Sequence, residues 1–185
     1  MPRPPRPHRL AAALLASAAA LLVSTPRAQA YEHQWHVGGS LGYSALWGGP
    51  TASGFGGGLH AAYGINDSIN LIGEIDATDH PYAQWAIVSG GVGAAYVVDV
   101  LQWVPWAGLI AGGAGLISTD AKCGLSIVEP CRAFRFNAEI PFGLDYQVSR
   151  SFSVGLGGRF QLLLLGDAPW MTMGIFARAE YTWGY

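Results

Sequence analysis

The sequence predicts an all-β protein, an eight-stranded antiparallel up-and-down β-barrel that spans a membrane. Composition is the first observation behind this prediction: of 185 residues, 51% are hydrophobic, 12% are charged and 26 are glycine. An average soluble protein has about 25% charged residues and about 7% glycine, so this chain is poor in charge and rich in glycine. The second observation is that apolar and polar side chains alternate with period two along most of the chain. That period is typical of strands with two different faces.

Residues 1–30 are typical of a secretory signal peptide. A basic head containing Arg3, Arg6 and Arg9 precedes an uncharged run over 10–23, and Ala28-Gln29-Ala30 fits the small-x-small cleavage rule. A retained anchor helix is the alternative, although the run of 14 residues is short for a membrane span. Cleavage would leave six Lys and Arg against twelve Asp and Glu in residues 31–185, which form one exported, mildly acidic domain.

The first four strands are expected where an apolar face opposes a face of small or polar residues. They cover 35–43, 54–63, 69–77 and 88–98. In 35–43, for example, Trp35, Val37 and Leu41 share one face, and His36 and Ser40 share the other. Each segment is about ten residues long, which is the length of a tilted strand across a bilayer.

The last four strands are expected over 104–114, 134–144, 152–164 and 171–185. Segment 134–144 alternates most regularly, with Phe134 and Phe136 opposite Arg135 and Asn137. Segment 104–114 is apolar and glycine-rich throughout, so its facing stays open. A membrane helix over 100–119 is the alternative there, and Pro105 together with four glycines disfavours it.

The connections alternate in length. Short turns are predicted over 64–68, 99–103 and 147–151, and longer loops over 45–53, 78–86, 115–133 and 165–170. Short turns at one end and long loops at the other are typical of barrels in the outer membrane of Gram-negative cells. An even number of strands puts both termini at the turn end, so we expect periplasmic termini and extracellular loops.

Aromatic residues indicate which face meets lipid. Those on the apolar faces gather near strand ends: Tyr43, Phe55 and Phe134 on the loop side, and Trp35, Tyr63, Tyr96, Phe142, Phe152, Trp183 and Tyr185 on the turn side. Two aromatic belts mark the two interfaces of a membrane, so the apolar face is predicted to contact outer-membrane lipid. Small inward residues such as Gly38 and Gly157 then leave room inside a barrel only just wide enough for side chains.

On these residues the chain resembles the small eight-stranded outer-membrane barrels of the OmpA/OmpX type, over essentially all of residues 31–185. The most specific match is the ending Tyr181-Thr182-Trp183-Gly184-Tyr185. It resembles the signal that the barrel-assembly machinery reads, with Tyr181, Trp183 and Tyr185 as the signal residues. The glycine usual upstream is replaced by Ala179-Glu180. The partners expected are therefore outer-membrane lipid and, during biogenesis, the assembly machinery, for a chain that stays monomeric.

Charged residues share the predicted inner face. They are Glu74, Asp76, Arg135, Glu139, Arg159, Arg178 and Glu180. A buried charge is costly unless it is paired and hydrogen-bonded, so we interpret these residues as a structural ion-pair network that fills the lumen. Glu74, Glu139, Arg159 and Arg178 are the predicted centre. A gated narrow pore is the alternative.

The remaining reactive residues are few. Cys123 and Cys131 both lie in the longest loop, and two nearby cysteines in an oxidising compartment usually form a disulfide; two free thiols are the alternative. His36 and His60 are interpreted as polar lumen fillers near opposite ends of their strand pair. We find no His-x-Ser motif, no Gly-x-Ser-x-Gly elbow and no paired Asp and His at the rim. We therefore expect no catalytic residue, metal or cofactor.

These observations favour a non-enzymatic outer-membrane barrel with a side-chain-filled lumen, acting as a structural or surface-presenting protein through its loops. A narrow channel for ions or small apolar molecules is the first alternative. An outer-membrane lipid-modifying enzyme is the second and less favoured one. No nucleic-acid partner is expected, because ten Lys and Arg against twelve Asp and Glu leave no positive excess.

Overall fold

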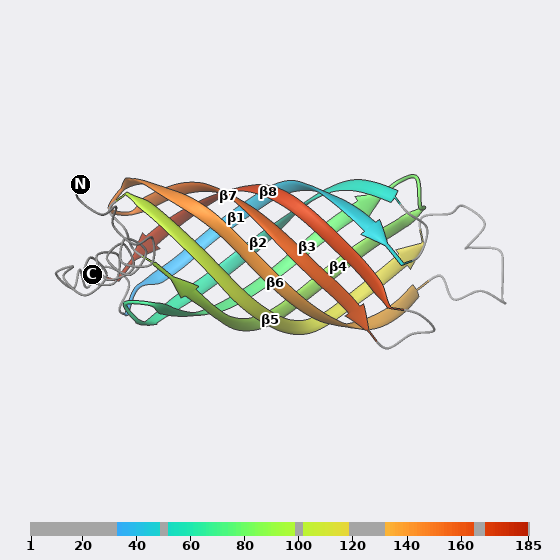
Figure 1. Cartoon of the computed structure of the whole chain (residues 1–185), viewed down its shortest axis with the longest axis horizontal. Helices are drawn as coiled ribbons and strands as arrows, with labels where there is room; N and C mark the ends of the chain where they lie inside the picture. The colour runs from blue at the N-terminus through green and yellow to red at the C-terminus, as the bar shows by residue number, and fades with distance from the viewer. Residues whose placement is uncertain (1–32, 49–51, 99–101, 119–131, 165–168, 185) are drawn as a thin grey trace, which may run out of the picture.

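The computed structural model describes residues 33–48, 52–98, 102–118, 132–164 and 169–184, which form one closed antiparallel barrel (Figure 1). Its strands follow one another in chain order, and the last pairs with the first, Trp35 opposite Trp183. They are β1 (Trp35–Trp47), β2 (Ala52–Asn66), β3 (Ile69–His80), β4 (Trp85–Val97), β5 (Trp103–Ser118), β6 (Arg132–Ser149), β7 (Phe152–Leu164) and β8 (Trp170–Trp183). The predicted fold class is confirmed. The predicted signal peptide and cysteine pair lie outside the described residues.

The segment 104–114, whose facing the sequence left open, is part of strand β5. It pairs with β4 on one side and β6 on the other, so the alternative of a membrane helix over 100–119 is wrong. Its side chains alternate: Val104 and Ile110 are buried inside, while Leu109 is 67% exposed on the outside. The described part of the chain contains no helix both long and apolar enough to cross a membrane.

The strands reach further at the loop end than predicted. Leu46 pairs with Ala52 and His80 with Trp85, so the connections expected over 45–53 and 78–86 shrink to residues 48–51 and 81–84. The prediction of long loops at these two places is wrong. A bilayer needs only about 9–11 residues per tilted strand, so strands of 12 to 15 residues extend beyond the hydrocarbon, where polar residues that suggest a loop can continue the ladder.

Two of the three predicted short turns lie wholly in described residues, and each is shorter than predicted: 67–68 within 64–68, and 150–151 within 147–151. Strands β2 and β3 are joined by two residues, and Oδ1 of Asn66 accepts hydrogen bonds from the backbone N–H groups of Ser68 and Ile69, each at 2.9 Å. Such a side chain replaces the backbone in closing a tight turn. Strands β6 and β7 are likewise joined by two residues, 150–151.

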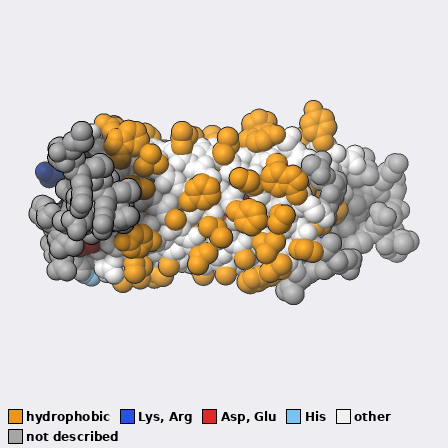
Figure 2. Space-filling view, viewed as in Figure 1, with side chains coloured by type: hydrophobic (Ala, Val, Ile, Leu, Met, Phe, Trp, Pro, Cys, Tyr) orange, Lys and Arg blue, Asp and Glu red, His pale blue; other side chains and the backbone are white. Residues whose placement is uncertain are grey.

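Large apolar side chains cover the outside of the barrel (Figure 2). Leu41, Phe55 and Leu156 are each more than 70% exposed on this surface. Aromatic pairs form at both ends: the rings of Trp35 and Tyr63 lie 4.9 Å apart at the turn end, and those of Tyr43 and Phe55 lie 5.3 Å apart toward the loop end. The predicted outward apolar face is confirmed for β1, β2 and β7, the strands of Leu41, Phe55 and Leu156.

The inside of the barrel holds three apolar clusters. At the loop end Leu46, Ile87, Ala114, Leu116 and Leu163 pack together with Trp85, Ala133 and Trp170 against them. Toward the turn end lie Val97, Val104 and Trp106, with Phe176 packed against them, and a third group of Ala62, Ile72, Ala95 and Ile110. Charged and polar side chains also face the lumen and are described next.

Candidate functional site

Arg159 of β7 is the centre of one charged cluster in the lumen. Its Nη1 lies 3.1 Å from Oδ2 of Asp76 and 3.8 Å from Oε1 of Glu74, and its Nε lies 3.7 Å from Oε1 of Glu139. The guanidinium also lies over the ring of Phe176, 5.0 Å from its centroid. All four charged side chains are at most 14% exposed, so the ion pairs are shielded from solvent.

A chain of neutral hydrogen bonds holds one side of this cluster. Thr172 donates to Gln161 at 2.9 Å, Gln161 donates to Ser89 at 2.9 Å, and Ser89 donates to Oδ2 of Asp76 at 2.8 Å. The chain crosses from β8 through β7 to β4 and fixes the Asp76 carboxylate. Sequence reasoning missed Gln161 and Thr172 as site residues, although their polar side chains at inward positions of apolar strands were the available signal.

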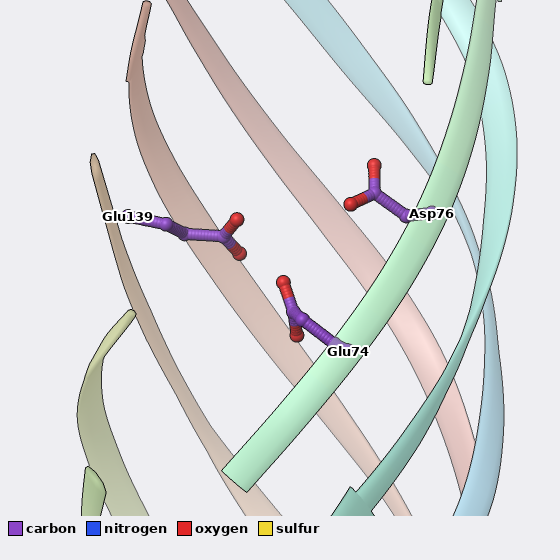
Figure 3. Close-up of side chains that lie close together, drawn as sticks. All are labelled: Glu74, Asp76 and Glu139. Atoms are coloured by element: carbon purple, nitrogen blue, oxygen red, sulfur yellow. The ribbon is translucent and has the colours of Figure 1, made fainter. Parts of the chain in front are cut away.

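Three carboxylates of the Arg159 cluster point toward one another (Figure 3). Glu74 and Asp76 come from β3 and Glu139 from β6, and one oxygen of each lies within 4.8 Å of the others. The Glu139 side chain is fully buried, and neither of its carboxylate oxygens accepts a hydrogen bond. We call these three residues the carboxylate triad.

Arg178 of β8 is the centre of a second charged cluster. It forms an ion pair with Glu180 and lies 3.7 Å from Oδ2 of Asp145 through its Nε. Glu180 also accepts hydrogen bonds from Nδ1 of His36 at 2.8 Å and from Nε2 of His60 at 3.0 Å. The Arg178 guanidinium lies 4.5 Å from the centroid of the Trp106 ring. Asp145 was missed because it lies just beyond the segment recognised as alternating.

His36 and His60 are not at opposite ends of their strand pair. The prediction is wrong because β1 and β2 are antiparallel, so the start of β1 lies beside the end of β2, and Gly38 of β1 pairs directly with His60. Both imidazoles therefore meet the same carboxylate, that of Glu180.

The predicted lumen residues thus lie in separate places. Glu74, Glu139 and Arg159 lie together, but Arg178, the fourth residue of the predicted centre, belongs to the other cluster. Arg135 lies over the ring of Trp170, 5.6 Å from its centroid, next to the apolar cluster at the loop end.

The predicted assembly-signal residues lie at the end of β8. Tyr181 and Trp183 face outward, are 56% and 42% exposed, and stack with centroids 6.1 Å apart. Their role in assembly stays a prediction. Tyr185, Cys123 and Cys131 lie outside the described residues.

A serine and a histidine also meet in the lumen. Oγ of Ser44 and Nε2 of His80 are joined by a hydrogen bond of 3.1 Å. A Ser–His pair acts as a nucleophile only when substrate reaches the hydroxyl and a third group orients the imidazole. His80 is fully buried, and its Nδ1 has no hydrogen-bond partner. The pair therefore does not have the arrangement of a catalytic triad.

A small cavity lies inside the barrel beside Arg159. Its volume is about 30 Å³, and its lining includes Asp76, Thr78, Ser44 and Phe176. A volume of this size holds about one or two water molecules. The space is too small for an organic substrate.

Solved structures show where this fold has been seen before. Neisserial surface protein A matches with a TM-score of 0.65 and 15% identity over 80% of this chain and 96% of that chain. The attachment invasion locus protein Ail of Yersinia pestis matches with a TM-score of 0.54 and 15% identity, over 82% and 99% of the two chains. Outer membrane protein OprG of Pseudomonas aeruginosa matches with a TM-score of 0.54 and 10% identity, over 84% and 98%.

The chain has the fold of the small outer-membrane β-barrels. Each of these neighbours is matched over nearly its whole length, so the likeness covers the complete barrel. By sequence, no family model and no curated protein matches the chain. The resemblance to OmpA/OmpX-type barrels noted from the sequence is thus supported at the level of fold.

Proposed function

We propose that this chain is a non-enzymatic protein of the cell outer membrane whose lumen is closed by its own side chains. Its role is structural, or it presents the connections at its loop end to the cell exterior. The observation that carries this proposal is the filling of the lumen along its length, from the loop-end apolar cluster to the two charged clusters. The outward apolar surface supports contact with outer-membrane lipid.

The lumen is filled in successive layers. Leu46, Leu116 and Leu163 are at most 1% exposed at the loop end. The Arg159 cluster follows, and the Arg178 cluster with Trp106 lies toward the turn end. An ion moving along the axis would lose its water at each apolar layer, and such a loss is costly without replacement ligands.

The proposed orientation puts both termini in the periplasm and the loop end outside the cell. The start of β1 and the end of β8 lie at the same end of the barrel (Figure 1). Tyr82, in the connection between β3 and β4, lies at the other end and is 88% exposed. Arg150, between β6 and β7, lies at the turn end and is exposed.

Labelling of intact cells tests this orientation. In a background with Cys123→Ser and Cys131→Ser, we expect a membrane-impermeant maleimide to label the Tyr82→Cys variant. The matched Arg150→Cys variant should react only after the outer membrane is permeabilised. Labelling of Arg150→Cys alone on intact cells would reverse the orientation and remove the basis for surface presentation.

A narrow channel is the second candidate, because polar groups do line part of the lumen. The cavity of about 30 Å³ beside Arg159 is the observation that favours it. Steady single-channel currents in planar bilayers would support the channel over the closed barrel. A lipid-modifying enzyme is less favoured because the Ser44–His80 pair is buried, and a screen with phospholipid and lipopolysaccharide tests it.

A further inference from the structure

We propose that the carboxylate triad of Glu74, Asp76 and Glu139 binds one calcium ion inside the lumen. The three side chains reach into the same space from opposite walls of the barrel, two from β3 and one from β6 (Figure 3). A cation held there would join the two walls. This inference is independent of whether the barrel presents its loops to partners.

The charge of the cluster calls for a cation. Three carboxylates share a single guanidinium, that of Arg159, at 3.1 to 3.8 Å. With all groups ionised, two negative charges remain uncompensated in a site shielded from water. A buried charge without a partner is strongly destabilising, and one divalent cation cancels both.

Carboxylate oxygens without a hydrogen-bond partner indicate that the carboxylate triad binds a ligand. Both carboxylate oxygens of Glu139 and Oε1 of Glu74 are buried without a hydrogen-bond partner. The two Oε1 atoms contact Arg159, at 3.7 and 3.8 Å, which is longer than a hydrogen bond. Asp76 contacts Arg159 and Ser89 through Oδ2, which leaves Oδ1 outside these contacts. In folded proteins the large majority of buried acceptors are hydrogen-bonded, so several oxygens without a hydrogen bond that face one space indicate a further ligand.

The chemistry and spacing of the triad favour calcium. Oxygen-only ligands select hard cations such as Ca²⁺ and Mg²⁺ rather than Zn²⁺ or Cu²⁺. Ligand atoms within 4.8 Å of one another can surround one ion at Ca–O distances of about 2.3–2.6 Å. Mg²⁺ requires about 2.0–2.1 Å and usually keeps several waters, for which the adjacent cavity of about 30 Å³ leaves little room.

Calcium binding to the purified barrel tests the proposal. The protein is folded into uncharged detergent, which binds no calcium itself, in either calcium chloride or EDTA, and bound ⁴⁵Ca²⁺ is then measured by equilibrium dialysis. We expect one ion per chain and a higher melting temperature in calcium chloride than in EDTA. Magnesium chloride at equal concentration should give a smaller rise.

Variants place the ion. Glu139→Gln should abolish binding, and Asp76→Asn is the second variant if the first does not fold. Asp145→Asn, which alters a carboxylate of the other charged cluster, is the matched control and should still bind one ion. Arg159→Met removes the competing positive charge and should tighten binding by about tenfold or more.

Two results would overturn the proposal. One is the absence of bound calcium in the folded wild-type barrel at neutral pH, which would mean that the triad is neutralised by protons. The other is binding that Glu139→Gln and Asp76→Asn leave unchanged, which would place the ion elsewhere on the chain. Arg159→Met distinguishes a calcium site from a purely structural cluster, because loss of a structural ion pair alone would not strengthen calcium binding.

Discussion

At the scale of single residues, inward glycines keep free the space that large lumen side chains occupy. A Cβ atom at Gly38 would lie 2.4 Å from the backbone oxygen of Ala179 and 2.6 Å from the imidazole of His60, and one at Gly157 would lie 2.6 Å from the ring of Phe176. Gly39, the next residue along β1, faces outward, and a Cβ there would meet its first neighbours at 3.5 Å. The high glycine content of the sequence therefore has a steric role inside the barrel.

Adding a single methyl group should have different effects on the stability of the barrel at the two faces of β1. We expect Gly38→Ala to lower the free energy of unfolding by about 1–3 kcal/mol, because the methyl group overpacks the inside of the barrel against the Ala179 backbone and His60. Gly39→Ala is the control and should leave it unchanged or raise it by up to about 1 kcal/mol. Urea unfolding in lipid vesicles measures both, and equal effects on the two faces would contradict the packing described here.

The Glu180 carboxylate joins three cationic or polar partners, Arg178, His36 and His60. Replacing it by alanine leaves the Arg178 charge buried, with Asp145 as its remaining acidic partner at 3.7 Å. We expect Glu180→Ala to destabilise the barrel by about 3–5 kcal/mol, as breaking a buried ion pair does. Asp79→Ala, which removes an exposed carboxylate near the loop end, is the control. A loss below about 1 kcal/mol in Glu180→Ala would show that the second cluster is solvated.

At the scale of strands, period-two alternation was enough to predict that a strand exists, and which of its side chains face the lumen, where its two faces differ chemically. It failed for β5 because both of its faces are apolar: Trp106 and Leu116 pack inside the lumen, and Leu109 faces outward. It also placed strand ends too early, since Asp79 is polar yet pairs with Phe55 in the ladder. Polarity marks the end of the membrane rather than the end of the strand.

Facing of β5 can be tested by the depth dependence of an added charge. Leu109 lies near the middle of β5 on the outside, and Ile117 lies on the same face near the loop end. We expect Leu109→Arg to cost about 2–4 kcal/mol in a bilayer and Ile117→Arg about 0–1 kcal/mol, because the penalty falls from midplane to interface. Equal costs at the two positions would mean that β5 does not cross the bilayer as described.

At the scale of the whole molecule, the candidate site depends on contacts across the lumen that no local pattern reveals. The sequence places Glu74 and Glu139 on inward faces, but their meeting requires the stagger of eight strands around a closed barrel. The same stagger separates Arg178 from Arg159 and brings Asp145 to Arg178. The sequence therefore predicts that these charged side chains face the lumen, but it does not predict that they divide into two clusters.

Filling of the lumen also gives the molecule its proposed lack of conduction. Apolar side chains pack together inside the loop end, and paired charges lie between them and the turn end. No described element has to move for the barrel to keep this arrangement, since every strand is hydrogen-bonded to two neighbours. Electrical conductance measures directly whether the lumen is closed.

Planar bilayer recording of the folded wild-type barrel is the most direct measurement. Folding is verified in the same preparation by the shifted electrophoretic mobility of the folded form. A closed lumen predicts no steady current in the wild type. The Leu109→Ala variant, which alters an outward side chain, is the control and should also show no steady current. Steady wild-type currents whose size changes in Arg159→Ala would show that the lumen is open, because ions would then pass through the Arg159 cluster.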